Sequence, residues 1–456
     1  MKNPEYQDYI IPFHEDLEKC ITDFILTIKD KNPQALNLGP YDISQPTLNY
    51  LWYKMLKLRE LYITNKSDNK TFSNLYNWAN NISEQVQKYS VNYNNTPTTH
   101  KIWAETLKGE RHKILFYASS VRLLECSIPL LSSLENELVI LTTEITEKAI
   151  QALPKVTFIK FTLTQEKLYH NPILENNFPQ LYQFANSIGW FIELLEPQLF
   201  LCLDGCQTEY KLAATFCTNK GIPSICIQHG WPSFLHTGFR HMPYTYFFTW
   251  GDKFNTLWKT HNPKTKFVET GYMYAPLENG RHDSITFFLQ APIFLSCQRY
   301  LEAMLKLIIK TALRYPQINI MIREHPEYIV KNTLHSTWRQ YPNIRIVSDC
   351  PIKEVYANTK IAISHYSSVI IECLIHGCTP LVFDQTTNSR YSPDIEKEGV
   401  GLIATDEDSL FYKIDSIISN NFKPKTEFQN LFKNIGEETL DKIRKKIDNI
   451  LTEGRL

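Results

Sequence analysis

Two short stretches in the C-terminal third of the chain constrain its fold most: residues 321–326 and residues 361–384. Each begins as an apolar run of strand length and passes into polar residues. The second then continues through an apolar segment of helical length to another apolar run, which ends at Asp384. Strands joined by helices form parallel sheets, which bind ligands beyond the carboxyl ends of their strands. The sequence therefore predicts a ligand crevice at these strand ends.

The polar residues at these strand ends favour an anionic ligand, and phosphate fits best. Ser367 and Ser368 stand where a helix is expected to begin, and a helix N-terminus offers N–H groups and partial positive charge. Arg323 and His325 follow the neighbouring strand and add donors, and Glu372 should converge on the same crevice. The alternatives are a simple N-cap for the serine pair and an ordinary loop position for the histidine.

Composition excludes several other classes of function. The 456 residues carry a formal net charge of zero, which provides no overall attraction to nucleic acid or to an anionic membrane. No apolar run reaches the roughly 20 residues of a membrane span, and no secretory signal is visible at the N-terminus. The ten cysteines show no zinc-ligand spacing and are expected to be reduced thiols of a cytoplasmic protein.

The hydrophobic pattern changes along the chain and predicts four segments. Residues 1–110 show helical periodicity, residues 111–275 and 282–430 each alternate strands with helices, and residues 431–456 end in a charged helix. Residues 276–284 are rich in turn-forming residues and are the expected linker. We therefore expect an α/β protein with two Rossmann-like domains facing across a cleft, preceded by a helical region.

The aromatic residues of the helical region have two interpretations. Core packing is typical of such residues, and the alternative is that they line a groove for an acceptor. They are Trp52, Tyr53, Trp78 and Trp103.

Two strand ends of the first alternating series carry candidate catalytic residues. Asp204 follows a continuous apolar strand, so burial should raise its pKa and suit it to act as a general base. Gly205 beside it allows a substrate to approach the backbone closely. His229, one strand later, can act as an acid or base or donate to a phosphate. A helix cap for Asp204 and a structural loop position for His229 are the alternatives.

These residues resemble a family. Asp204-Gly205, His325-Pro326 and Ser367-Ser368 are similar to motifs of GT-B-fold bacterial surface-polysaccharide glycosyltransferases, namely sialyltransferases, polysialyltransferases and capsule-type Kdo transferases. The resemblance covers about residues 112–430. The sequence departs from the family pattern at Leu203, where a second acidic residue is common, and at Arg323, where lysine is common.

The resemblance implies an inverting, metal-independent transfer of a sugar from a nucleotide sugar to a cell-surface glycan. Asp204 would deprotonate the acceptor hydroxyl, while His325 and the serine pair would bind the donor phosphate. Glu372 would contact the ribose or the sugar of the donor. A CMP donor of sialic acid or Kdo type is the expectation, with no cofactor and no nucleic-acid partner.

Two other functions remain open, and the type of glycan acceptor also bears on where in the cell the protein acts. A UDP-N-acetylglucosamine 2-epimerase shares the architecture, and a non-catalytic nucleotide- or glycan-binding protein is the second alternative. An oligosaccharide or lipid-linked acceptor would be consistent with a cytoplasmic protein associated peripherally with the inner membrane.

Overall fold

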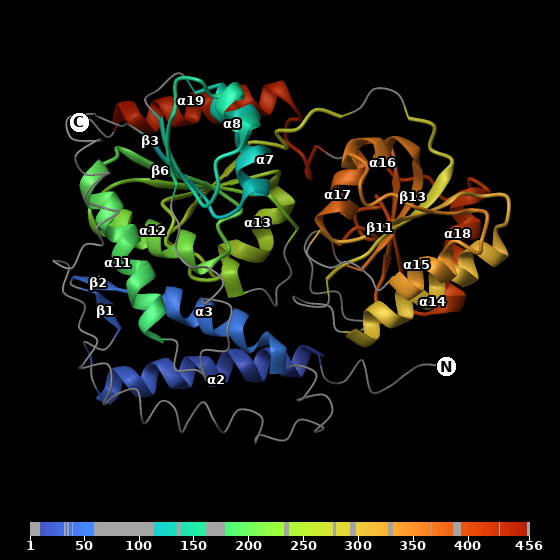
Figure 1. Cartoon of the computed structure of the whole chain (residues 1–456), viewed down its shortest axis with the longest axis horizontal. Coiled ribbons are helices and arrows are strands. Elements are labelled where there is room, and N and C mark those ends of the chain that lie inside the picture. The colour runs from blue at the N-terminus through green and yellow to red at the C-terminus, as the bar shows by residue number, and fades with distance from the viewer. Residues whose placement is uncertain are drawn as a thin grey trace.

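The structure is a computed structural model, and it places two parallel sheets side by side with a helical layer beneath the first (Figure 1). It describes residues 10–31, 33, 36–38, 40–58, 114–134, 138–160, 178–231, 237–276, 280–291, 298–326, 332–365, 367–385, 394–427 and 429–453. Trp78, Trp103 and residues 277–279 of the predicted linker lie outside the described residues.

The first sheet has seven strands, and every neighbouring pair is parallel. In spatial order the strands are β5 (Thr157–Lys160), β4 (Leu138–Thr142), β3 (Ile114–Ala118), β6 (Leu199–Leu203), β7 (Ser224–Ile227), β8 (Tyr246–Thr249) and β9 (Lys266–Glu269). Five-residue runs such as β3 and β6 are buried along their whole length, because helices cover both faces of a parallel sheet.

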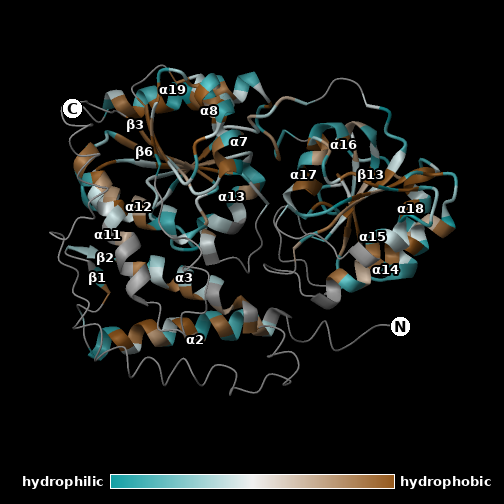
Figure 2. Ribbon diagram, in the orientation of Figure 1, coloured by the Kyte–Doolittle hydropathy of each residue, from teal (hydrophilic) through white to brown (hydrophobic). Residues whose placement is uncertain are grey.

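The second sheet has six strands, again all parallel. In spatial order they are β12 (Ile344–Ile346), β11 (Ile320–Arg323), β10 (Ser284–Phe288), β13 (Thr359–Ser364), β14 (Thr379–Phe383) and β15 (Leu402–Ala404). The colouring in Figure 2 shows apolar strands in the interior and helices with mixed surfaces outside them. The predicted α/β class with two Rossmann-like sheets is thus confirmed.

Helices connect the strands of both sheets. Around the first sheet they are α7 (Val121–Ser132), α8 (Glu147–Ala152), α11 (Phe178–Leu195), α12 (Thr208–Asn219) and α13 (Asp252–Lys259). Around the second they are α14 (Gln298–Arg314), α15 (Asn332–Trp338), α16 (Ile352–Asn358), α17 (Ser368–Ile375) and α18 (Glu407–Ile418).

The N-terminal helical region shares one hydrophobic core with the first domain. It consists of α2 (Ile10–Lys31), a short hairpin of β1 (Asn37–Leu38) and β2 (Tyr41–Asp42), α3 (Ser44–Met55) and the 3-10 turn η1 (Leu56–Leu58). The buried face of α2 and Trp52 of α3 belong to the same apolar cluster as β3 and β6. Trp52 is fully buried, as the core interpretation expects.

The last helix, α19 (Glu437–Glu453), returns to the first domain and packs against α7 (Figure 1). Its apolar face is buried in that core, with Leu440, Ile443, Ile447, Ile450 and Leu451 at helical spacing. The chain therefore crosses between the two domains twice.

Candidate functional site

The strand order of each sheet reverses at one point, and ligands of open parallel sheets bind outside the strands at that point. In the first sheet the reversal lies between β3 and β6, and in the second it lies between β10 and β13. Asp204 directly follows β6, and Arg122 is the second residue of α7, just after β3. Ser367 and Ser368 follow β13. Of the predicted site residues, Asp204, Ser367 and Ser368 thus stand at the two reversal points, whereas His229 follows β7 and His325 follows β11.

The backbone at Asp204 holds a conformation that few residues adopt. Its φ is +75°, in the left-handed region, and the N–H of Gly205 donates to the carbonyl of Leu203 at 3.0 Å across a three-residue turn. The N–H of Asp204 donates to the carbonyl of Ile227 on β7 at 2.9 Å. Such strain persists where surrounding contacts enforce it, and it is common at functional sites.

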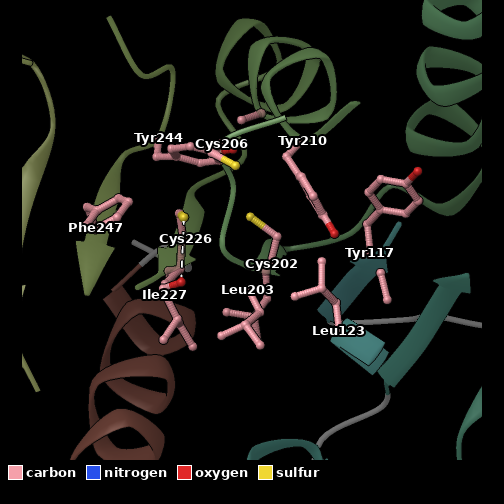
Figure 3. Close-up of a cluster of buried hydrophobic side chains, with 14 of the residues drawn as sticks. Tyr117, Leu123, Cys202, Leu203, Cys206, Tyr210, Cys226, Ile227, Tyr244 and Phe247 are labelled. Carbon is pink, nitrogen blue, oxygen red and sulfur yellow. Dashed lines mark hydrogen bonds between the residues drawn. The ribbon is translucent and has the colours of Figure 1, made fainter. Parts of the chain in front are cut away.

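Gly205 makes this turn sterically feasible. Its φ is +62°, and a Cβ atom at this position would overlap Cys226 Sγ and approach Tyr244 Oη. Tyr244 Oη donates to the Gly205 carbonyl at 2.7 Å. Figure 3 shows this cluster of tyrosine and cysteine side chains packed around the turn. A residue other than glycine would displace the segment that carries Asp204.

Burial raises the pKa of the Asp204 carboxyl. The Cys206 thiol, which donates to Asp204 Oδ2 at 3.2 Å, and the positive charge of Arg122 both oppose that rise. A carboxyl whose pKa lies above its ordinary value is a better proton acceptor once it is ionised. Asp204 therefore has the chemistry expected of a general base.

His229 is neutral at physiological pH. Burial, with the positive charge of Arg122, lowers its pKa to about 3. Neither ring nitrogen is hydrogen-bonded to any residue that the structure describes, although both nitrogens are shielded from solvent. Its ring lies edge-on to that of Tyr274, with the ring centroids 6.4 Å apart. A neutral imidazole of this kind can donate to or accept from a ligand.

In the second domain, the N-terminus of α17 is not capped by a side chain. Ser367 occupies the N-cap position with an extended backbone, but its hydroxyl makes no cap hydrogen bond. The backbone N–H groups of the first turn of α17 are thus available as hydrogen-bond donors to a ligand. Glu372, one turn further along, has its pKa raised by burial, which hydrogen bonds from Tyr272 and the charge of Arg122 partly offset.

Direct contacts join the two domains at this place. Tyr272, in the segment that leaves the first domain, donates from Oη to Glu372 Oε2 at 3.0 Å. A Cβ atom added to Gly230, next to His229, would lie 3.9 Å from Cβ of Ser368. The end of β7 therefore meets the start of α17.

Arg122 was not predicted from the sequence, yet its charge acts on Asp204, His229 and Glu372. Its side chain is exposed, and among the described residues none forms an ion pair with it. The only sequence signal was the Ser119-Ser120 pair that ends the preceding strand. An unpaired guanidinium beside two carboxyls and a helix N-terminus is suited to an anionic ligand.

Arg323 and its neighbours follow β11. Nη1 of Arg323 donates to the carbonyls of Val347, at 2.8 Å, and of Cys350, so this nitrogen holds the turn after β12. A phosphate contact from Arg323 would have to use its other nitrogens. Glu324, which the sequence did not single out, is buried and accepts from His335 Nε2 at 2.9 Å. His325 is half-buried just beyond the strand.

Another pair of residues lies at the ends of β13 and β14. His365 Nε2 is 3.8 Å from Asp384 Oδ1, and both side chains are buried. The two residues follow neighbouring parallel strands, so they meet at the edge of the sheet that carries Ser367.

A cavity of about 580 Å³ lies between α14 and α18, and Phe383 and Gln385 at the end of β14 form part of its wall. Lys310 pairs with Glu407 at its wall, and Asp406 already caps α18. Within the described ranges, no group of three or more His, Cys, Asp or Glu side chains could hold a metal ion. Of the helices described, none is long and apolar enough to cross a membrane.

No family model matches the sequence, and no curated protein matches it. Solved structures share the fold. A UDP-GlcNAc 2-epimerase from Neisseria meningitidis bound to UDP-GlcNAc is 14% identical, with a TM-score of 0.53 over 74% of this chain and all (100%) of that chain. The MnaA-UDP structure from S. aureus is 12% identical, with a TM-score of 0.53 over 75% of this chain and 97% of that one.

The wall teichoic acid polymerase TagF (H548A variant) is 10% identical, with a TM-score of 0.48. The match covers 85% of this chain and 100% of the TagF chain. At these identities, the Neisseria meningitidis and S. aureus structures establish the two-domain α/β fold and nothing about activity. The TagF match is too distant to add to this conclusion.

Proposed function

We propose that the protein is a glycosyltransferase that moves a sugar from a nucleotide sugar to a glycan acceptor, with inversion at the anomeric carbon. The observation that carries this proposal is that the end of β7, next to the Asp204 turn of the first domain, meets the uncapped start of α17 in the second domain. The positive charge of Arg122 acts on Asp204 in the first domain and on Glu372 in the second.

In the proposed reaction, the acceptor hydroxyl oxygen attacks the anomeric carbon and gives its proton to Asp204. The bond from the anomeric carbon to the phosphate oxygen breaks, and the nucleotide leaves with the negative charge. The N–H groups of α17 and the Arg122 guanidinium stabilise that charge. His229, neutral in the unliganded protein, hydrogen-bonds the donor, and His325 and Ser368 contribute to phosphate binding.

The donor that we propose is a CMP-linked acidic sugar of sialic acid or Kdo type. Such a donor carries a carboxylate as well as a phosphate, and the exposed Arg122 supplies the matching cation. The acceptor in this proposal is an oligosaccharide or lipid-linked glycan of the cell surface, met at the cytoplasmic face of the inner membrane.

A thermal-shift series with CMP, CDP, UDP and GDP tests the donor class. A nucleotide at about 100 times its Kd stabilises the folded state by about 2.7 kcal/mol, which raises Tm by a few degrees. His325→Ala should reduce the shift, whereas Asp204→Ala should keep the shift and abolish transfer. Full turnover by Asp204→Ala would refute the assignment of the base.

Epimerisation of a nucleotide sugar is the second candidate, because three protonatable groups with shifted pKa values surround the site: Asp204, His229 and Glu372. Incubation with UDP-GlcNAc and no acceptor separates the two functions. An epimerase converts the sugar to its 2-epimer, which proton NMR detects. A transferase leaves the sugar unchanged apart from slow hydrolysis.

A further inference from the structure

The helical N-terminal region reaches the candidate base through one side chain. Tyr53, near the end of α3, donates from its hydroxyl to Cys206 Sγ at 3.3 Å. The Cys206 thiol in turn donates to Asp204 Oδ2 at 3.2 Å. Residues 153 positions apart in sequence thus form one continuous hydrogen-bonded chain that ends on the carboxylate. We propose that Tyr53 is a positioning residue for Asp204 and acts on it through the Cys206 thiol.

The position of Tyr53 is fixed by a second contact on the same face of α3. Asn49, four residues earlier and therefore one helical turn away, accepts from Thr208 Oγ1 at 3.1 Å. Thr208 is the first residue of α12 and lies two residues after Cys206. Both Asn49 and Thr208 are buried. Two side chains of one helix face thus hold the loop that carries Asp204.

The first domain holds the same segment from a second side. Gln207 Oε1 accepts from Ser119 Oγ at 2.9 Å, and the Ser119 N–H donates to Tyr210 Oη at 2.9 Å. Because the loop is fixed on both sides, the thiol of Cys206 has few orientations. The hydroxyl of Tyr53 occupies a lone pair of the sulfur and so favours the rotamer that directs S–H to Asp204.

This chain has a chemical consequence. A donor to a carboxylate stabilises the charged form, so the thiol opposes the effect of burial and keeps Asp204 ionised at lower pH. The titratable groups that face Asp204 are Tyr53 on α3, Arg122 on α7, Tyr210 on α12, Cys226 on β7 and Cys206 in its own loop. Among these groups, Cys206 donates a hydrogen bond to the carboxyl.

The inference rests on the proposed role of Asp204, but its test does not require turnover. Full-length protein labelled with carboxyl-13C aspartate is titrated by carbon NMR, and Asp204→Asn identifies the Asp204 signal. Cys206→Ala removes the donor, so the midpoint of Asp204 should move to higher pH. Cys206→Ser keeps a donor and should restore the midpoint to the wild-type position or below it.

Tyr53→Phe keeps the ring and removes the hydroxyl, so it should also shift the midpoint upward, by less than Cys206→Ala. The matched control is Tyr41→Phe. Tyr41 also bonds from the helical region to the first domain, donating to Glu193 Oε1 at 3.4 Å, but it is not part of the chain to Asp204. An unchanged midpoint in Cys206→Ala, or equal effects of Tyr53→Phe and Tyr41→Phe, would overturn the proposal.

Turnover adds a separate readout. If CMP-sialic acid is consumed, the acidic limb of the pH–rate profile should move upward in Cys206→Ala, and the rate at pH 6 should fall by about tenfold. If the wild type consumes neither CMP-sialic acid nor CMP-Kdo, the proposed donor class fails, whereas the NMR titration still decides the role of Tyr53.

Discussion

Replacing Gly205 by alanine should destabilise the first domain through two separable effects. The first is conformational: a side chain at a φ of +62° costs about 1–2 kcal/mol. The second is steric, because the new Cβ would overlap Cys226 Sγ and crowd Tyr244 Oη, and overpacking of a core costs about 1–3 kcal/mol. Together they give a loss of about 2–5 kcal/mol.

Gly221 offers a matched control for the conformational effect. Its φ of +70° is nearly the same, at the end of α12, but no atom lies within 4 Å of a Cβ built there. Gly221→Ala should therefore cost only about 1–2 kcal/mol. The difference between the two variants measures the steric contribution. A Cys226→Ala background should reduce the cost of Gly205→Ala, since it removes the overlapping sulfur atom.

Urea unfolding, followed by far-UV circular dichroism, measures these costs. With an m-value of about 2 kcal/mol/M, the midpoint should fall by about 0.5–1 M for Gly221→Ala and by about 1–2.5 M for Gly205→Ala. Equal shifts for the two variants would refute the steric argument. They would also mean that the turn at Asp204 does not depend on the close approach of Cys226.

Three further predictions concern charge. Burial lowers the pKa of Lys211 to about 7. Between pH 7 and the ordinary value of 10.5, the unfolded chain therefore binds a proton that the folded chain lacks, so the free energy of unfolding should rise with pH in this range. Lys211→Met should flatten that rise, as measured by urea unfolding at several pH values. Tyr272→Phe removes the bond to Glu372 and should cost about 1 kcal/mol in the same assay, and no loss would show that this contact contributes nothing to domain docking. Arg122→Met removes a positive charge and should raise the pKa of His229, which proton NMR of the imidazole reports; an unchanged pKa would place the guanidinium elsewhere.

Most strands of both sheets could be predicted from the sequence because a parallel strand is buried on two faces; the short, partly buried β15 was not predicted. The run that became β6 is apolar at all five positions, and Asp204 marks its end. The same logic located His229 and Ser367, since polar residues after such runs lie at the carboxyl edge of the sheet. Their proposed roles remain predictions, because placement at a sheet edge does not establish contact with a ligand.

The contacts that the sequence did not reveal come from outside the strand ends. Arg122 is the second residue of a helix, where an exposed arginine has no distinctive local pattern. Tyr53 reaches Cys206 across 153 residues, a contact that depends on how the helical region packs. Tyr272 lies on the connection between domains. Local periodicity predicts which face of an element is buried, but it does not identify the partner.

The return of the chain to the first domain limits how the domains can move. Tyr272 and residues 434–436 exchange backbone bonds: the Tyr272 N–H donates to the Asn434 carbonyl at 2.9 Å, and the Gly436 N–H donates to the Tyr272 carbonyl at 2.8 Å. A Cβ at Gly271 would overlap the backbone of Asn434, so the two crossing segments are packed in direct contact. Because both segments and α19 are fixed to the first domain, closure over a donor must bend the chain on the second-domain side of Tyr272. In the proposed reaction, that arrangement would keep Asp204 and its supporting loop stationary while the helix start at Ser367 moves toward them on closure.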